Sequence, residues 1–401
     1  MWRYEDGGPA RPQTVPGRLD VTPERGLQAT TRVAPAATMV VGDGERLYLL
    51  RHTAGDGAVG IVESVHPESM EVVASSPDLA GGPVWPGGIG LDGSGSLHVV
   101  FGNHAHRLER DLGVVASCRL PRDRPYNGFV PLPDGTLVTK DFAGSRPGVR
   151  VPPEAREPCE LVALDPLTLD VVARLELPEA SIARLSADGD DVYVVGDTSL
   201  FRVRWDGRSL RRDGHLRAPY RVLDGQTYGW DCVLALGAAW FLDDGEGSEA
   251  FAGTMRGLGL SMAPLHLVRV DLRSGMVRLS EVCGLLGGLV ANPPLLDQGR
   301  RLVVAYDSGN GVMACFDADT LEVRWRREQD HASHLLLYAE SGELVSGDGN
   351  DVVVLDIDSG RELARVDPGH GIQSVLFPCP GTGRDFYVTS FVGVSRVRVV
   401  D

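Results

Sequence analysis

Residues 352–366, VVVLDIDSGRELARV, contain a strand, a polar turn and a second strand, and six earlier segments have the same form. In each segment, apolar runs flank a short polar turn, most often with Asp, Ser or Gly, which is the pattern of a β-hairpin. Counted from the turns at His66, Arg110, Asp165, Trp205, Asp271, Asp317 and Asp356 to Asp401, the spacings are 44, 55, 40, 66, 46, 39 and 45 residues. A repeat of this length made only of short strands predicts the blade of a β-propeller.

Each repeat can be divided into four strands, named A to D from the axis outward. The expected blades are residues 37–79, 84–121, 126–178, 181–219, 229–284, 290–329, 333–367 and 372–401. The last repeat stops at Asp401, before its D strand, and residues 27–36, LQATTRVAPA, can supply that strand from the other end of the chain. Closure of this kind pairs sheet edges that would otherwise stay open. We therefore expect an all-β, single eight-bladed propeller of four-stranded blades, closed by an N-terminal strand.

The expected domain organisation follows from the repeat. No single blade can bury both of its faces, so residues 27–401 are predicted to form one propeller domain. Residues 1–26 are rich in Pro, Gly and Arg and show no periodicity. We expect them to form a flexible N-terminal arm.

Charge and cysteine content restrict the partners and the compartment. The formal charge of −16 repels nucleic-acid phosphates and anionic lipids, so we expect neither a nucleic acid nor a membrane as partner. No apolar run approaches the roughly 18 residues of a membrane span, and the N-terminal residues lack an apolar leader, so a cytoplasmic location is expected. The six cysteines are scattered, which indicates buried reduced thiols.

Four hairpin turns carry a shared motif of Asp, two residues and then Thr or Ser: LDPLTLD (164–170), VDLRSGM (270–276), FDADTLE (316–322) and LDIDSGRE (355–362). This motif resembles the repeat of the quinoprotein-like, PQQ-repeat, eight-bladed propellers. The quinone-binding enzymes of that family also carry adjacent cysteines, tryptophan-rich docking repeats and a secretion signal, and the sequence shows none of these. The resemblance therefore implies the fold without a bound quinone, and we expect no cofactor.

The two faces of the predicted ring differ. The A–B and C–D turns are short and lie on one side, which we call the turn face. The B–C loops and the crossings to the next blade lie on the other side, which we call the loop face. The two longest insertions, residues 142–158 and 245–264, are both B–C loops. Long loops on one face of a rigid ring predict a binding or catalytic surface, so a small-molecule pocket is expected there.

Candidate catalytic residues stand at the ends of the B strands. Asp recurs there at positions 141, 197, 243, 307 and 348, which favours a turn cap over a site residue. Lys140 departs from this pattern. A neutral lysine near pH 7 needs a pKa about three units below normal, so Lys140 is expected to act as a fixed cation, or alternatively to form a salt bridge across the channel. The predicted catalytic set is Lys140, Asp141, Asp243, Asp244 and Glu246.

Residues that lead into the A strands are expected to line the channel mouth. Aromatic, amide and imidazole side chains gather at these positions and suit a small-molecule pocket. The same residues could instead close their own blades by hydrogen bonding to backbone groups, an alternative that is favoured for the two asparagines. The predicted substrate-binding residues are Trp85, Tyr126, Asn127, Trp230, Asp231, Asn292, His334 and Gln373.

A metal is not expected, although His104 and His106 could supply ligands because alternate residues of a strand point to one side. Two hypotheses about function remain. The first is an acid–base enzyme of lyase, isomerase or hydrolase type that acts on an organic metabolite. The alternative is a non-catalytic propeller that binds a protein or peptide on the loop face. The enzyme is favoured slightly, because the unusual residues lie toward the axis.

Overall fold

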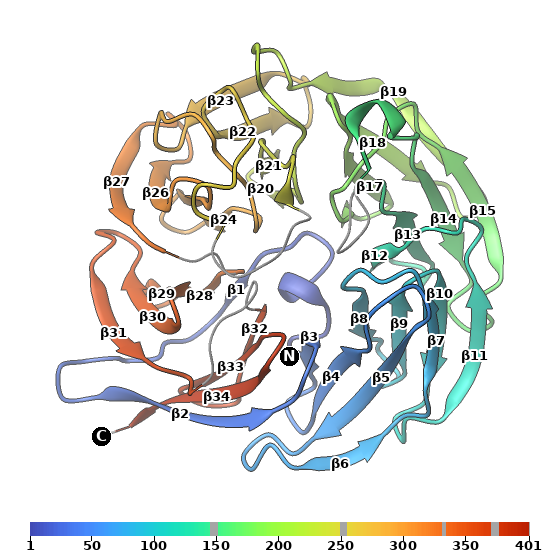
Figure 1. Ribbon diagram of the computed structural model, residues 1–401, viewed down its shortest axis with the longest axis horizontal. Coiled ribbons are helices and arrows are strands. Elements are labelled where there is room, and N and C mark those ends of the chain that lie inside the picture. The colour runs from blue at the N-terminus through green and yellow to red at the C-terminus, as the bar shows by residue number, and fades with distance from the viewer. Residues whose placement is uncertain (145–150, 249–254, 331–333, 370–376, 401) are drawn as a thin grey trace.

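The computed structural model describes residues 1–144, 151–248, 255–330, 334–369 and 377–400. Eight sheets are arranged radially around one axis, as Figure 1 shows. Each sheet contains one antiparallel four-stranded blade, with the strands in sequence order from the axis outward in seven of them. The predicted eight-bladed, all-β propeller is therefore confirmed.

The first four blades follow one another along the chain. Blade one contains β3 (Ala37–Gly42), β4 (Leu47–His52), β5 (Ala58–Val65) and β6 (Val72–Ser75), and β7 (Leu79–Gly82) pairs with the other end of β5. Blade two contains β8 (Gly88–Leu91), β9 (Leu97–Phe101), β10 (His104–Leu108) and β11 (Val114–Arg119). Blade three contains β12 (Tyr126–Pro131), β13 (Leu137–Asp141), β14 (Glu160–Leu164) and β15 (Val171–Glu176). Blade four contains β16 (Ser186–Asp188), β17 (Asp191–Val195), β18 (Ser199–Trp205) and β19 (Leu210–Pro219).

The remaining blades complete the ring. Blade five contains β20 (Val233–Ala235), β21 (Ala238–Leu242), β22 (His266–Asp271) and β23 (Val277–Glu281). Blade six contains β24 (Leu295–Asp297), β25 (Leu302–Asp307), β26 (Val312–Asp317) and β27 (Val323–Glu328). Blade seven contains β28 (Leu336–Tyr338), β29 (Glu343–Asp348), β30 (Asp351–Asp356) and β31 (Glu362–Val366). Blade eight contains β32 (Phe377–Pro380), β33 (Asp385–Thr389), β34 (Gly393–Val400) and β2 (Gly26–Val33). Two 3₁₀ turns, η1 (Glu5–Gly7) and η2 (Pro153–Ala155), complete the secondary structure of the described residues.

Strand β2 closes the ring. It pairs antiparallel with β34 over all eight of its residues, from Gly26 opposite Val400 to Val33 opposite Gly393. The two ends of the chain thus share one blade, as expected. The strand ends at Val33 rather than at residue 36, because β34 begins at Gly393, opposite Val33, and Ala36 has a left-handed backbone with a φ of 54°.

Burial explains why the inner strands have few polar residues. All five residues of β21 are buried, since an inner strand is covered by the neighbouring blades on both faces. The outer strand β11 instead alternates between exposed and half-buried residues, because only one of its faces packs against the ring. Within the described residues, no helix is both long enough and apolar enough to cross a bilayer.

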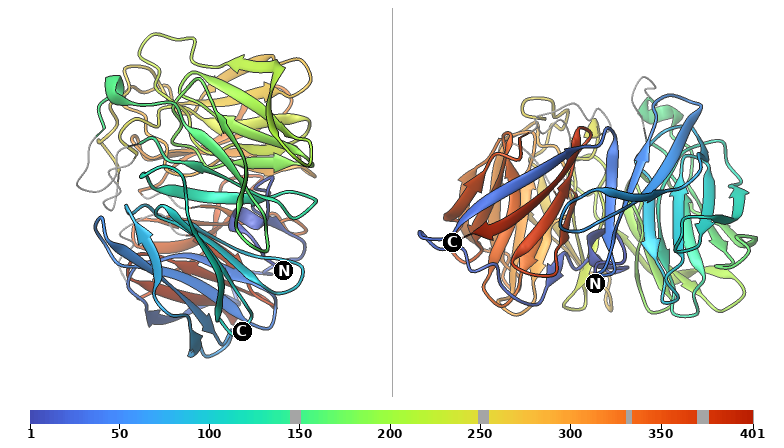
Figure 2. Two further views of the ribbon diagram at one scale, coloured as in Figure 1. Left: turned by 90° about the vertical axis from the view of Figure 1, so that its right-hand side faces the viewer. Right: turned by 90° about the horizontal axis from the view of Figure 1, so that it is seen from below.

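The N-terminal segment, residues 1–25, is packed inside the ring rather than forming the flexible arm expected from its composition. Figures 1 and 2 show the N-terminus near the axis and at one end of it. The backbone of Trp2 exchanges hydrogen bonds with Gly42 of β3, and β1 (Thr14–Val15) pairs in parallel with β28. The segment lacks periodicity because successive residues contact different blades, so no single face repeats along it.

Backbone hydrogen bonds join this segment to the innermost strands near the turn face. The amide of Leu91 donates to the carbonyl of Arg3, and that of Ala187 to the carbonyl of Pro9. In the same way, the amide of Leu234 donates to the carbonyl of Ala10, and that of Leu337 to the carbonyl of Gln13. These contacts reach blades two, four, five and seven, so residues 1–25 close the turn-face end of the channel. The segment is sequestered because its buried polar groups all need partners, and the inner strands supply many of them.

We predict that replacing residues 26–33 by a Gly-Ser linker of equal length removes a stability comparable to the roughly 5–15 kcal/mol of a typical folded domain. The linker preserves the connection to residues 1–25 but cannot sustain the pairing with β34. Thermal unfolding followed by circular dichroism tests this expectation. An unchanged melting temperature would refute the closure.

A second substitution tests the packed N-terminal segment. The Gln13 side chain is fully buried, donates from Nε2 to the Pro294 carbonyl at 2.7 Å and accepts from the Leu335 amide at 3.3 Å. Gln13→Ala leaves both backbone groups without these partners, so chemical denaturation should show a loss of about 2 kcal/mol or more. Gln28→Ala, at an exposed position of β2, is the control and should change stability by less than about 0.5 kcal/mol. Equal effects of the two substitutions would contradict the packing.

Candidate functional site

A small cavity lies on the loop-face side of the axis, opposite the end closed by residues 1–25. Its volume of about 20 Å³ has room for one or two water molecules. Most of the lining residues lead into, or begin, the innermost strands of different blades. They are Ala37, Thr38, Trp85, Pro86, Arg184, Trp230, Ala291, His334, Phe377 and Phe391. The structure thus brings together Trp85, Trp230 and His334 of the predicted binding residues.

Aromatic rings form much of the cavity wall. Trp85 stacks on Phe142 with ring centroids 4.3 Å apart and planes 16° from parallel. The imidazole of His334 lies 4.3 Å from the ring of Phe377. These side chains are held by packing between blades, so the wall is largely preformed.

A buried ionic network lies beneath the cavity. Arg11 Nη1 is 2.6 Å from Asp6 Oδ2 and 3.3 Å from Glu5 Oε1. His334 Nδ1 is 2.8 Å from Asp6 Oδ1. We call Glu5, Asp6, Arg11, Arg184, Asp231 and His334 the axial network.

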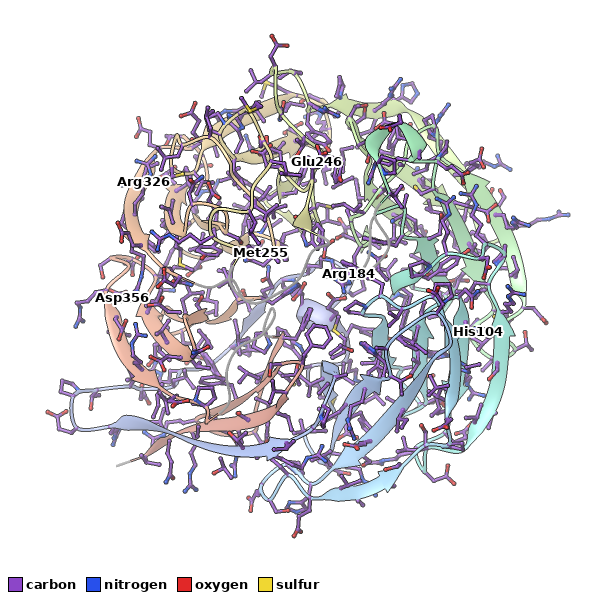
Figure 3. All side chains as sticks on the ribbon, in the orientation of Figure 1. His104, Arg184, Glu246, Met255, Arg326 and Asp356 are labelled. Carbon is purple, nitrogen blue, oxygen red and sulfur yellow. The ribbon has the colours of Figure 1, made fainter. Side chains whose placement is uncertain are left out.

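Asp231 joins blades four and five to this network. Its Oδ1 accepts a hydrogen bond from the Arg184 backbone amide at 2.6 Å. Its Oδ2 lies 3.6 Å from Arg184 Nη1 and 3.8 Å from Arg11 Nη1. Figure 3 places Arg184 close to the axis. The N-terminal segment thus contributes three of the six residues of the axial network, Glu5, Asp6 and Arg11, and the blades contribute the other three.

The axial network fixes the charge of Asp6. Burial alone would raise the pKa of Asp6, but His334 and Arg11, which both bond to the carboxylate, lower it to about 2. Asp6 is therefore ionised at neutral pH and orients Nδ1–H of His334. This Asp–His arrangement could assist proton transfer if a ligand reached the other ring nitrogen.

The same residues do not suit a metal ion. Glu5, Asp6 and His334 present ligand atoms within 4.8 Å of one another. The Arg11 guanidinium already occupies the cation position between the two carboxylates, at 2.6 and 3.3 Å. A divalent ion there would face a fixed positive charge.

His104 and His106 lie on β10, away from the axis. His106 Nδ1 bonds to Ser117 Oγ at 2.8 Å and its Nε2 to the Ala80 carbonyl at 2.7 Å. His104 Nδ1 bonds to the Gly81 carbonyl at 2.9 Å. Because both nitrogens of His106 are engaged, the pair holds β7 against blade two and does not offer the metal site considered from the sequence.

Lys140 is fully buried but does not line the cavity. Its Nζ donates to the carbonyls of Asp141 and Ser181, at 3.0 and 3.1 Å, and so links blade three to the approach to blade four. Burial lowers the pKa of Lys140. Among the residues that the structure describes, Lys140 forms no salt bridge across the channel, and its ammonium group is bonded to backbone carbonyls instead of facing the cavity.

Two of the predicted catalytic aspartates cap strands. Asp141 Oδ1 accepts from the Glu160 amide at 2.5 Å, and Asp243 Oδ1 accepts from the His266 amide at 2.6 Å. In both blades the donor is the first residue of the third strand, which matches the turn-cap alternative. Glu246 is half-buried, and its amide donates to Thr227 Oγ1 at 3.3 Å.

Three further predicted binding residues bond to nearby backbone. Tyr126 Oη accepts from the Arg122 amide at 3.3 Å, and Asn127 Nδ2 donates to the Ile182 carbonyl at 3.0 Å. Asn292 Nδ2 donates to the carbonyl of the adjacent Pro293 at 3.1 Å. Gln373 lies outside the described residues. The contacts of Tyr126 and Asn292 match the alternative in which each residue closes its own blade, whereas Asn127 bonds across to the approach to blade four.

Four residues of the axial network were not predicted from the sequence: Arg184, Glu5, Asp6 and Arg11. Arg184 stands two residues before β16, as His334 stands two residues before β28, so the register of the repeat contained a signal for it. The three N-terminal residues had no such signal, because they belong to no blade.

The raised pKa of Asp244 leads to a prediction about how the stability of the fold depends on pH. Burial, together with the Asp243 carboxylate, raises the pKa of Asp244 to about 8. A raised folded-state pKa stabilises the fold below the unfolded value of about 3.9, and this stabilisation is lost as the pH rises toward 8. Asp244→Asn should therefore flatten the fall in stability between pH 5 and pH 8 measured by denaturant unfolding. Asn is suitable because it tolerates the φ of 61° at this position. Asp224→Asn, at an exposed site, should leave that pH dependence unchanged, and equal slopes for wild type and Asp244→Asn would contradict the assignment.

Comparison with known proteins defines the fold. No protein-family model and no curated protein matches the chain. Among solved structures, BamB from Moraxella catarrhalis has a TM-score of 0.63 at 13% identity, covering 92% of this chain and 97% of that one. The quinohemoprotein alcohol dehydrogenase of Comamonas testosteroni has a TM-score of 0.66 at 11% identity (99% and 80% coverage), and that of Pseudomonas putida HK5 a TM-score of 0.66 at 10% identity (99% and 79%).

These likenesses raise the question of a quinone. A cavity of about 20 Å³ does not fit a fused-ring quinone, and the six cysteines include no adjacent pair. The chain has the eight-bladed, PQQ-repeat type of propeller fold that BamB and the quinohemoprotein alcohol dehydrogenases share.

Proposed function

We propose that this propeller is a non-catalytic binding module that docks a partner protein on its loop face. The observation that carries the proposal is a group of exposed apolar side chains on three adjoining loops around blade five. We call this group the blade-five patch. Its members are Val222, Leu223, Leu258, Leu260, Met262, Leu285 and Leu286, which are 44–72% exposed.

The three loops form one continuous surface. The Met262 amide donates to the Gly225 carbonyl at 3.2 Å, which joins the central loop to the crossing from blade four. The Gly287 amide donates to the Ser261 carbonyl at 2.9 Å, which joins it to the crossing into blade six. Figure 3 shows this region through the labelled Glu246 and Met255, over the strands of blade five. The patch is thus assembled from segments up to about 60 residues apart in the sequence.

Exposure of so many large apolar side chains on one surface has a physical cost. Full burial of a Leu, Val or Met side chain is worth about 1.5–3 kcal/mol. Large contiguous apolar patches on soluble proteins mark interaction sites, whereas single exposed apolar residues are normal. Leu258 and Leu260 flank Gly259, at which an added Cβ would clash with the Gly287 backbone, so the loops are packed and present these side chains outward.

The proposed partner presents apolar side chains flanked by basic ones. Asp224 and Glu281 are exposed at the margins of the patch, while Arg256 is neutralised by Asp330 at 2.5 Å. A net charge of −16 adds long-range attraction for a basic surface. Docking is favoured over acid–base catalysis because Lys140, Asp141 and Asp243 are engaged in bonds that hold the blades together.

We predict that Leu260→Asp weakens partner binding at least about tenfold without changing the melting temperature, because a carboxylate placed in an apolar interface must be desolvated. Met276→Asp is the matched control, since Met276 is 55% exposed on the turn face of the same blade. A photo-crosslinking residue at position 260 identifies the partner in cells, and a second at position 276 serves as background. The purified partner is then titrated against wild type and both variants.

Two outcomes would contradict the proposal. The first is crosslinking of the same protein from positions 260 and 276. The second is equal affinity of wild type and Leu260→Asp for the purified partner.

A further inference from the structure

We propose that a second cavity, on the turn face between blades eight and one, binds a small aromatic monocarboxylate. The carboxylate would be held by the guanidinium of Arg46 and the indole N–H of Trp2. This cavity is separate from the small one at the axis, and it lies on the opposite face from the blade-five patch. The proposal is therefore independent of protein docking.

Turns of both blades and the start of the chain surround the second cavity. Figure 1 shows the N-terminus between the strands of blade eight and those of blade one. The volume is about 220 Å³, compared with about 20 Å³ at the axis. Trp2, Leu47, Pro67, Pro380 and Tyr387 give the cavity an apolar wall. Arg46 is the one charged side chain among the described residues that line it.

Arg46 is a cation without an ionic partner. It lies in the tight turn between β3 and β4, where Asp43 Oδ1 accepts from the amides of Glu45 and Arg46, both at 2.8 Å. The two acids of this turn are engaged by Arg110, whose Nη2 lies 2.6 Å from Glu45 Oε2 and 3.4 Å from Asp43 Oδ2. The Arg46 guanidinium forms no salt bridge or hydrogen bond with any residue that the structure describes. It can therefore pair with the carboxylate of a ligand.

The indole of Trp2 supplies a second donor. Its backbone exchanges two hydrogen bonds with Gly42, at 2.9 and 3.0 Å, and the residue is only 3% exposed. Cζ3 and Cη2 of its six-membered ring lie against Gly7, so Nε1 is at the opposite edge of the indole. Within the described part of the chain, Nε1 has no hydrogen-bond partner, and Trp2 borders the cavity. A largely buried N–H without a partner is costly, and a ligand oxygen would satisfy it.

The local charge favours an anion. No carboxylate is present among the described residues that line the cavity. Asp385, which packs against the lining residue Gly381, is paired with Arg396, whose Nε lies 2.8 Å from Asp385 Oδ2. The net charge of −16 is spread over the whole chain, and its effect is screened beyond about 8–10 Å at physiological ionic strength. Arg46 therefore sets the charge preference of the cavity.

The cavity is large enough for one aromatic ring and its carboxylate. An apolar cavity of about 150 Å³ holds benzene, so a volume of about 220 Å³ leaves room for a carboxylate group as well. Tyr387 Oη donates to the Pro67 carbonyl at 2.9 Å, which fixes the tyrosine ring and joins blades eight and one. We expect the ring of the ligand to lie against this apolar wall. Benzoate is the simplest probe of the class.

Isothermal titration of the full chain with benzoate tests the site. Benzamide has nearly the same shape without the charge, and acetate has the charge without the ring. Each should bind at least about tenfold more weakly than benzoate. Arg46→Met removes the cation and should reduce benzoate affinity by a similar factor. Arg273→Met is the matched control, because Arg273 is exposed in a turn on the same face of the ring, at blade five, and should have no effect.

A second variant tests the other donor. Trp2→Phe keeps an aromatic ring but removes Nε1–H, and should lower benzoate affinity at least about threefold. Circular dichroism checks that both variants fold, and Arg46→Met should keep the wild-type melting temperature because Arg46 has no described partner to lose.

Three outcomes would overturn the proposal. The first is benzamide or acetate binding as tightly as benzoate. The second is wild-type benzoate affinity in folded Arg46→Met. The third is wild-type affinity in folded Trp2→Phe, because Nε1–H would then not contact the carboxylate.

Discussion

The structure depends on the pairing of β2 with β34. A blade is a sheet with two faces to cover, and a ring of blades covers them only if its last member is complete. Without β2, the outer edge of β34 would be left unpaired, and the blade that joins the two ends of the chain would lack its fourth strand. Because this strand comes from the opposite end of the chain, closure makes the stability of every blade depend on a contact between residues more than 350 positions apart.

The same geometry explains the path of residues 1–25. The chain must reach the outside of blade eight, and residues before β2 cross the turn-face end of the channel on the way. There they meet the innermost strands, whose edges toward the axis carry unpaired backbone groups. Carbonyls of Arg3, Pro9 and Ala10 satisfy some of these groups. The polar side chains that composition assigned to a flexible arm become the floor of the channel, so closure and channel filling have one cause.

The two ends of the channel therefore differ in what they can bind. At the turn face the channel is filled by the chain itself, and the charged groups of the axial network are paired. At the loop face a small cavity remains, bordered by Arg184 and His334, and the blade-five patch lies on the same side. The cavity at the axis and the blade-five patch therefore lie on the same face of the ring. This division also separates the residues that stabilise the ring, such as Lys140 and Asp141, from those that remain available to a ligand.

The sequence determined the repeat, the number of blades, the closing strand and the difference between the two faces, because these follow from local periodicity and turn chemistry. It also indicated that the recurring aspartates are caps. It did not determine which polar side chains meet at the axis. Asp6 and His334 are 328 positions apart, and no periodic pattern connects them. Only the tertiary structure brings Arg11, Arg184 and Asp231 together, since buried charges are located by pairing across blades and not by any property of the segments that carry them.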